Sequence, residues 1–214
     1  MTVLLFAIIL TAGCSTHYVS TVWKNDHASP GKYNKILVAA IVTNSDTAWR
    51  RQIEDDFKET LEGTGYQTVS SFAEFGVDGL KYLGQEDTYI KLSERGIDAI
   101  MTIAPVYRPA STPNATRGAY TNPVKYYYNR IWHYKEQQAQ SAVFEYDTAT
   151  RFSWEMILFD LSTLQPHYIA ESRSADGNIH QSMREEFWKA FIKKLQKDRF
   201  LKNRPPITVV QKSF

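Results

Sequence analysis

The sequence predicts a single α/β domain, a mixed sheet of about five or six strands with three or four packed helices. An apolar run from Lys35 to Thr43 precedes a helical pattern, and a second helical pattern leads into another apolar run at Ile97. Such strand–helix–strand steps lay helices onto a sheet through right-handed crossovers. After residue 150, alternating polarity indicates antiparallel strands.

The first predicted strand, Lys35 to Thr43, is rich in β-branched residues, as expected for a strand covered on both faces. The helix after it begins near Ser45 or Asp46 and ends before Gly63 and Gly65. Its predicted buried stripe repeats every fourth residue, at Trp49, Ile53, Phe57 and Leu61.

Residues 66–71 read as a second strand, residues 86–96 as a helix that closes at a glycine, and residues 97–107 as a third strand. A meander of strands is predicted from segments 141–147, 151–163 and 166–174. Alternation in its middle strand places four apolar residues on one face: Phe152, Trp154, Met156 and Leu158.

The last predicted helix runs roughly from His180 to Lys197 and carries a stripe of Met183, Phe187, Phe191 and Leu195. We therefore expect the α/β domain to occupy residues 35–200, with an insertion at 108–138 and a tail at 201–214. Residues 14–34 are polar and without period, which predicts a flexible tether.

The amino terminus has the form of a secretory signal. Val3 to Leu10 is apolar but too short to cross a bilayer, and small residues follow it up to the chain's only cysteine, Cys14. Residues 1–13 are therefore predicted to be a signal peptide. The alternative is an ordinary start followed by a buried free cysteine.

Composition excludes several classes of function. The 25 basic and 23 acidic residues give a net charge of +2, which offers no electrostatic case for nucleic-acid binding. A lone cysteine allows no disulfide within the chain. The histidines lack metal-binding spacing, so no metal or cofactor is expected; they are His17, His27, His133, His167 and His180.

The stretch LTAGC ending at Cys14 resembles the bacterial lipobox. That resemblance implies a diacylglycerol thioether on Cys14 and an acylated amino terminus, with palmitate among the expected chains. Ser15 stands where retention at the inner membrane calls for Asp, so the resemblance implies the outer membrane, facing the periplasm.

Five segments together resemble a group of small bacterial lipoproteins: KILVAAIVT, IEDDFKETLEGTGY, RGIDAIMTI, MILFDLST and EEFWKAFIKKL. Similar folds occur in the amino-terminal domain of TolB, in lipoproteins that activate penicillin-binding proteins and in curli secretion lipoproteins. The resemblance covers roughly residues 35–104 and 151–197 and implies fold and location rather than an activity. The sequence lacks an obvious pair of membrane-spanning β segments, so a pore is not implied.

No catalytic constellation stands out. The carboxylates of Glu54, Asp55 and Asp56 are consecutive on a helix, point in different directions and are interpreted as a solvated face, with Glu54 paired to Lys58. Glu145 and Glu155, on neighbouring predicted strands, form the one glycosidase-like pair.

The aromatic-rich insertion is the feature that packing explains least. Tyrosine, tryptophan and arginine are enriched at protein interfaces. We expect either a docking surface, a stacking platform for sugars, or a hairpin that covers the sheet. The candidate binding residues are Tyr126, Tyr127, Tyr128, Arg130, Trp132 and Tyr134.

From these features the sequence predicts a non-catalytic envelope lipoprotein that binds a periplasmic or outer-membrane protein. The alternative is a protein that binds a glycan or small ligand, or binds and hydrolyses it, in a groove beside the insertion. The sequence leaves the partner and the oligomeric state open.

Overall fold

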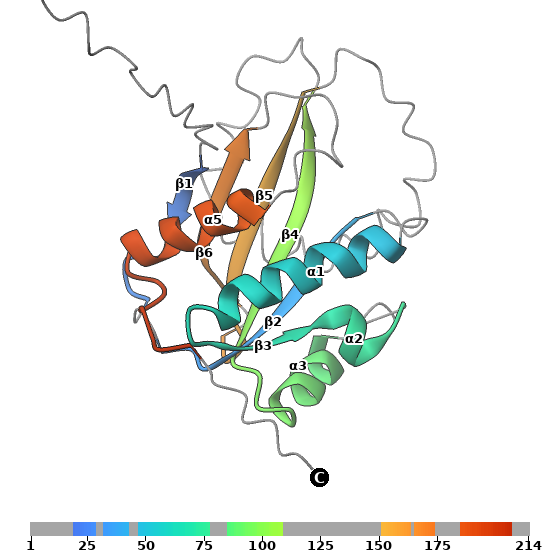
Figure 1. Cartoon of the computed structure of the whole chain (residues 1–214). Helices are drawn as coiled ribbons and strands as arrows, with labels where there is room; N and C mark the ends of the chain where they lie inside the picture. Colours follow the sequence, from blue (N-terminus) through green and yellow to red (C-terminus); the bar gives the residue numbers. More distant parts are fainter. Residues whose placement is uncertain are drawn as a thin grey trace, which may run out of the picture.

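The computed structural model describes residues 19–28, 32–42, 47–77, 85–108, 151–163, 165–173 and 185–206. Within these residues the fold is one mixed sheet of six strands with four helices, which confirms the predicted class (Figure 1). The strands are β1 (Val19–Lys24), β2 (Lys35–Ala40), β3 (Gln67–Ser70), β4 (Ala99–Arg108), β5 (Arg151–Asp160) and β6 (Gln165–Arg173). The helices are α1 (Thr47–Glu62), α2 (Ser71–Phe75), α3 (Gln85–Ser93) and α5 (Glu185–Lys197).

The sheet has a parallel part and an antiparallel part, in the order β1-β6-β5-β4-β2-β3. Strand β2 pairs in parallel with β3 and with β4, and α1 is the crossover between β2 and β3. From β4 onward the neighbours β5, β6 and β1 are antiparallel. The predicted meander is therefore present in β5 and β6, whereas segment 141–147 lies outside the described residues.

One face of the sheet is covered by α1 and α5 (Figure 1). The predicted stripe of α1 packs there, with Ile53, Phe57 and Leu61 buried against the sheet. Trp154 and Trp188 are both 0% exposed at the centre of this layer. Edge-to-face contacts such as Phe57–Trp188, with ring centroids 5.1 Å apart, fill the space between helices and strands.

A smaller apolar cluster covers part of the opposite face. Leu92 and Phe75, from α3 and α2, pack with Leu37, Ile157 and Phe159 of the sheet. Alternation along β5 separates these two layers, because Trp154, Met156 and Leu158 face α1 and α5 while Ile157 and Phe159 face the other way. The sequence prediction for this strand is confirmed for the residues whose side chains are described.

The predicted tether at residues 14–34 differs from the structure. Residues 19–24 form the edge strand β1, which pairs antiparallel with β6 from Val19–Ser172 to Lys24–Tyr168. The segment VSTVWK is short and mostly half-buried, with a register shift between Thr21 and Trp23. Its strand conformation rests on pairing with a partner almost 150 residues away in sequence, which no local pattern reveals.

The predicted tail also begins within the packed domain. Leu201 is 2% exposed and belongs to the core. The backbone N–H of Lys202 donates to Tyr66 Oη at 2.7 Å, and the Arg204 guanidinium lies 4.4 Å from the centre of the Tyr66 ring. Residues 201–206 therefore pack against the domain beside the start of β3.

In the described part of the chain, no helix combines the length and apolar character that crossing a bilayer requires. The predicted signal peptide and most of the insertion, from residue 109, lie outside the described residues.

Candidate functional site

The two ends of the sheet carry different chemistry. At one end, here called the Val19 end, β1 begins while β4 and β6 finish and β5 begins with Arg151 (Figure 1). At the other, the Asp160 end, β4 begins at Ala99 and β5 finishes at Asp160. Because β4 spans ten residues, the two ends are separated by roughly 30 Å.

A cavity of about 380 Å³ opens at the Asp160 end. It lies between the start of β2, the end of α3 and the turn after β5. Its lining combines charged, hydroxyl and aromatic side chains with two aliphatic ones: Lys32, Tyr33, Tyr89, Ser93, Gly96, Ile97, Asp98, Asp160, Leu161 and Ser162.

Asp160 is the most buried charged group of this cavity, at 1% exposed. Lys32 forms an ion pair with its Oδ2, and Ser162 and the Thr163 backbone N–H donate to its Oδ1, the latter at 3.0 Å. Burial acts to raise the pKa of Asp160, but the hydrogen bonds from Lys32 and Ser162 and the Lys32 charge outweigh it and lower the pKa. Asp160 is therefore ionised at neutral pH.

Tyr33 and His167 are buried and, together with Lys32 and Asp160, form a cluster of four polar side chains. Tyr33 Oη lies 2.5 Å from His167 Nδ1, and His167 Nδ1 lies 3.9 Å from Asp160 Oδ2. Burial lowers the pKa of His167, the Asp160 charge opposes that shift, and the Lys32 charge adds to it. Burial and then the Asp160 charge raise the pKa of Tyr33. The cluster thus holds one anion, one cation and two neutral groups at neutral pH.

Asp98, which immediately precedes β4, lines the cavity. Its carboxylate accepts from the backbone N–H groups of Asn34 at 2.8 Å and Lys35 at 3.2 Å. Burial raises the pKa of Asp98, while these two hydrogen bonds oppose the shift. The carboxylates of Asp98 and Asp160 thus both accept hydrogen bonds from protein donors at the lining of the cavity.

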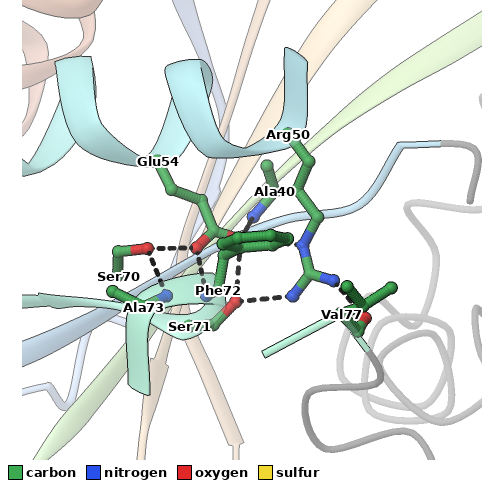
Figure 2. Close-up of polar contacts among 8 residues, drawn as sticks. All are labelled: Ala40, Arg50, Glu54, Ser70, Ser71, Phe72, Ala73 and Val77. Carbon is green, nitrogen blue, oxygen red and sulfur yellow. Dashed lines mark hydrogen bonds and ion pairs between the residues drawn. The ribbon is translucent and has the colours of Figure 1, made fainter. Parts of the chain in front are cut away.

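A second polar centre lies inside the protein, around Glu54 (Figure 2). Its Oε1 accepts from Ala40 N at 3.0 Å, Arg50 Nε at 3.1 Å and Ser71 Oγ at 2.7 Å. Its Oε2 accepts from Ser70 Oγ and Phe72 N, both at 2.7 Å. The five donors fill the acceptor positions of the carboxylate, so this centre joins α1 to β2 and α2 and offers no ligand position.

The solvated-face interpretation of Glu54 is therefore wrong, since Glu54 is 0% exposed. Lys58 does not pair with it but with Glu62, at 3.0 Å. Glu54 lies next to the apolar stripe of α1, so its side chain is buried with that stripe. There, groups of β2 and α2 donate hydrogen bonds to its carboxylate. Asp55 and Asp56 are half-buried.

Most sequence-predicted site residues lie outside the described residues. This holds for the lipidation candidate, for one glutamate of the glycosidase-like pair and for the aromatic candidates: Cys14, Glu145, Tyr126, Tyr127, Tyr128, Arg130, Trp132 and Tyr134. Glu155 is described; it is 5% exposed in β5 and lies opposite Glu171 of β6. Among the described residues, no group of three His, Cys, Asp or Glu side chains is arranged to hold a metal.

Sequence reasoning missed the cluster of Lys32, Tyr33, Asp160 and His167. Its members come from a segment interpreted as tether, the end of β5 and the beginning of β6. One weak signal exists: Asp160 follows an apolar run of β5 and precedes Ser162 and Thr163, a pattern typical of an Asx turn at a strand end.

Three solved structures with a similar chain path come from bacteria. A PelC dodecamer from Paraburkholderia phytofirmans carrying one substitution has a TM-score of 0.42 and 9% identity, covering 87% of this chain and 99% of that chain. A DUF4136 family protein from Bacteroides thetaiotaomicron has a TM-score of 0.42 and 13% identity, with 87% and 98% covered. A second PelC dodecamer structure gives 0.41 and 10%, with 87% and 99% covered.

No protein-family model and no curated protein matches the chain. TM-scores and identities this low carry no argument about activity or assembly. Lipoprotein character and a relation to TolB or to activators of penicillin-binding proteins therefore stay predictions.

Proposed function

We propose that the protein is a lipid-anchored accessory protein of the bacterial envelope, held at the periplasmic face of the outer membrane through Cys14, that binds an envelope protein partner. It acts by contact rather than by catalysis. The aromatic residues between Tyr126 and Tyr134, within the insertion at 108–138, supply the contact.

One topological observation carries this proposal. Val19 lies in the same register row as Ser172, Trp154 and Pro105, close to the point where β4 ends and β5 begins. The chain toward Cys14 and the chain of the insertion therefore leave the domain at one end of the sheet. A lipid on Cys14 would keep the insertion near the membrane, where membrane proteins and their periplasmic parts are within reach.

The anchor has a direct test. Mass spectrometry of the mature protein is expected to find an acylated, diacylglyceryl-modified Cys14 at the amino terminus, and Cys14→Ser is expected to release the protein from the membrane fraction. An unmodified Cys14 in a soluble fraction would refute the anchor. A Ser15→Ala variant, which alters the neighbouring residue without removing the thiol, is the control.

The contact is tested by crosslinking in intact cells with a photo-reactive residue at position 132. Capture of one envelope protein is expected, and loss of that capture in the Tyr127→Ala, Trp132→Ala and Tyr134→Ala variants with an unchanged melting temperature. A large fall in melting temperature would instead assign these rings to packing against the domain.

The cavity at the Asp160 end favours a second candidate, binding of a small polar ligand. Lys32, whose side chain is 39% exposed, offers a donor, and Tyr89, which is 39% exposed, offers a ring face for stacking. This cavity lies at the Asp160 end of the sheet, whereas β4 ends and β5 begins at the Val19 end. Isothermal titration with wall-derived saccharides tests the candidate, with Tyr89→Ala expected to abolish any heat of binding.

A further inference from the structure

We propose that the cavity at the Asp160 end of the sheet binds an amino sugar whose amine is a free ammonium group, held by the carboxylate of Asp98. The proposal rests on the second candidate function above, ligand binding in this cavity. It adds the chemical class of the ligand and the residue that selects it.

The lining of the cavity carries one net negative charge. Its charged residues are two aspartates and one lysine: Asp98, Asp160 and Lys32. The charges of Asp160 and Lys32 offset each other, because the two side chains form an ion pair. Asp160 is also 1% exposed, and its Oδ1 accepts from Ser162 and from the backbone N–H of Thr163. The charge that remains for a ligand is therefore that of Asp98.

Asp98 is a half-buried carboxylate with acceptor capacity to spare. Its Oδ2 accepts from the backbone N–H of Asn34 at 2.8 Å, and its Oδ1 accepts from that of Lys35 at 3.2 Å. Both donors are uncharged, so they orient the carboxylate without offsetting its charge. Because a carboxylate has about four acceptor positions, at least one remains for a donor of the ligand.

The basic side chains around Asp98 are engaged by other groups. Lys35 Nζ donates to the Arg95 carbonyl at 2.8 Å, and Arg204 Nη1 donates to Asn34 Oδ1 at 3.2 Å. Burial raises the pKa of Asp98 despite the opposing backbone hydrogen bonds and the Arg204 charge. The surroundings thus stabilise the ionised form less well than water does. An ammonium group in the cavity would supply the missing positive charge through a charge-assisted hydrogen bond.

The other lining groups suit the hydroxyls and the ring of a sugar. Lys32 Nζ has three N–H donors, and those not directed at Asp160 are available to ligand oxygens, as is the hydroxyl of Ser93, an exposed residue. Tyr89 is exposed and offers a ring face, next to the apolar side chain of Ile97. Such a combination of apolar surface and a few placed polar groups is typical of small-molecule sites.

The size of the cavity limits the ligand to about one sugar ring. A volume of 380 Å³ holds about a dozen water molecules at roughly 30 Å³ each, and a hexosamine has a similar number of non-hydrogen atoms. A zwitterionic amino acid brings no net charge and would leave the charge of Asp98 unbalanced. An N-acetylated sugar replaces the ammonium by a neutral amide. The charge of the lining therefore selects a free amine.

Isothermal titration of the full-length protein with three matched sugars tests this selection. Glucosamine, glucose and N-acetylglucosamine share one ring and differ in the substituent next to the anomeric carbon. Slightly below neutral pH, glucosamine is expected to bind at least about tenfold more tightly than the other two, as one charge-assisted hydrogen bond predicts. Glucose or N-acetylglucosamine binding as tightly would overturn the ammonium assignment but leave the cavity a sugar site. No binding of any of the three would overturn the assignment and the second candidate function together.

Asp98→Asn removes the charge at nearly constant shape. Its affinity for glucosamine is expected to fall at least about tenfold, to that of glucose, with the affinity for glucose little changed. An Asp98→Asn variant that binds glucosamine like the parent would overturn the proposal. Because asparagine keeps one acceptor oxygen for two backbone donors, the melting temperature is measured alongside, and a second variant leaves these hydrogen bonds intact.

Ser93→Lys is that second variant, since it adds a positive charge at the exposed end of α3 without altering Asp98. It is expected to weaken glucosamine binding about tenfold or more by repulsion between like charges. Ser93→Gln, of similar length but uncharged, is expected to retain most of the affinity. Gln52→Lys, at an exposed position of α1 on the opposite face of the sheet, adds the same charge away from the cavity and is expected to bind like the parent. An equal loss in Ser93→Lys and in either control would overturn the proposal, because the loss would not then reflect charge inside the cavity.

Discussion

Arg50 and Glu54 form an ion pair inside the protein, with Arg50 Nε 3.1 Å from Glu54 Oε1 and the Glu54 side chain 0% exposed. The two residues are one turn apart in α1, and Arg50 also donates to Ser71 Oγ at 2.9 Å and to the Val77 carbonyl at 2.8 Å (Figure 2). Through this pair, α1 is fixed to the segment that follows β3.

Replacing Glu54 is expected to destabilise the fold strongly. Glu54→Gln removes the charge that Arg50 faces and replaces one acceptor oxygen by an amide NH2, so the donors to that oxygen lose their acceptor, which costs about 3 kcal/mol or more in the free energy of unfolding. Urea unfolding measures this change. Glu59→Gln, at an exposed position of the same helix, is the control and is expected to change stability by less than about 0.5 kcal/mol. Similar midpoints for both variants would contradict the buried junction.

Gly65 is expected to tolerate no side chain. Its φ is +85°, and an added Cβ would lie 2.4 Å from Arg204 Cβ and 2.4 Å from the Pro205 carbonyl oxygen. Gly65→Ala must therefore displace the segment that closes the domain beside Tyr66.

Gly76→Ala separates backbone strain from this close approach. Gly76 has a similar φ of +73°, but nothing lies within 4 Å of an added Cβ. Gly76 has ψ −163°, a backbone region almost confined to glycine, so we expect a cost of about 1–3 kcal/mol from strain alone for Gly76→Ala. We expect a larger cost for Gly65→Ala, measured by chemical unfolding. Equal costs would show that residues 204–205 can move away from the added Cβ without a loss of stability.

Acid is expected to destabilise the cluster of His167 and Asp160 in two steps. The lowered pKa of His167 means that the unfolded chain, with a pKa near 6.5, binds the proton first, so stability falls as pH drops below about 6.5. Because the pKa of Asp160 is lowered in the folded protein, its ionised carboxylate stabilises the fold above about pH 4. This contribution to stability is lost as the pH falls through the pKa of the folded state.

A His167→Gln variant tests the first step. Its free energy of unfolding is expected to be nearly flat between about pH 7 and 5 while the fall below about pH 4 remains. Thermal melts in a series of buffers measure both. A parent protein whose stability rises from pH 7 to 5 would contradict the neutral state of His167.

High pH is expected to destabilise the protein through deprotonation of Tyr168. Its hydroxyl donates to Asp198 Oδ2 at 2.6 Å, and burial, followed by this hydrogen bond, raises its pKa. A raised folded pKa gives stability that is complete below the unfolded value near 10 and is lost as pH rises above it.

The Tyr168→Phe variant is expected to lose about 1–2 kcal/mol at neutral pH, because Asp198 keeps Thr21 and Lys194 as donors, and to show a shallower decline above about pH 10. Tyr89→Phe, at a residue that is 39% exposed, is the comparison and should leave both quantities unchanged. An unaltered alkaline decline in Tyr168→Phe would assign the effect to other tyrosines, such as Tyr33.

The sequence by itself determined the elements with strong periodicity. The stripe of α1, the apolar run of β2 and the alternation of β5 are local patterns in the sequence. Each of them predicts which residues are buried without reference to distant parts of the chain. The α/β class followed from their order. The lipobox at Cys14 is likewise a local pattern, and it stays a prediction.

Only the tertiary structure decided what depends on distant partners. VSTVWK became β1 because β6 offers it an edge, and Glu54 became buried because Ala40, Ser70 and Phe72 bring donors to it. The cluster of Lys32, Tyr33, Asp160 and His167 formed because two strand ends and the start of β2 meet at one end of the sheet. Such contacts join residues whose spacing in the sequence carries no period, so their energies appear only once the chain has folded.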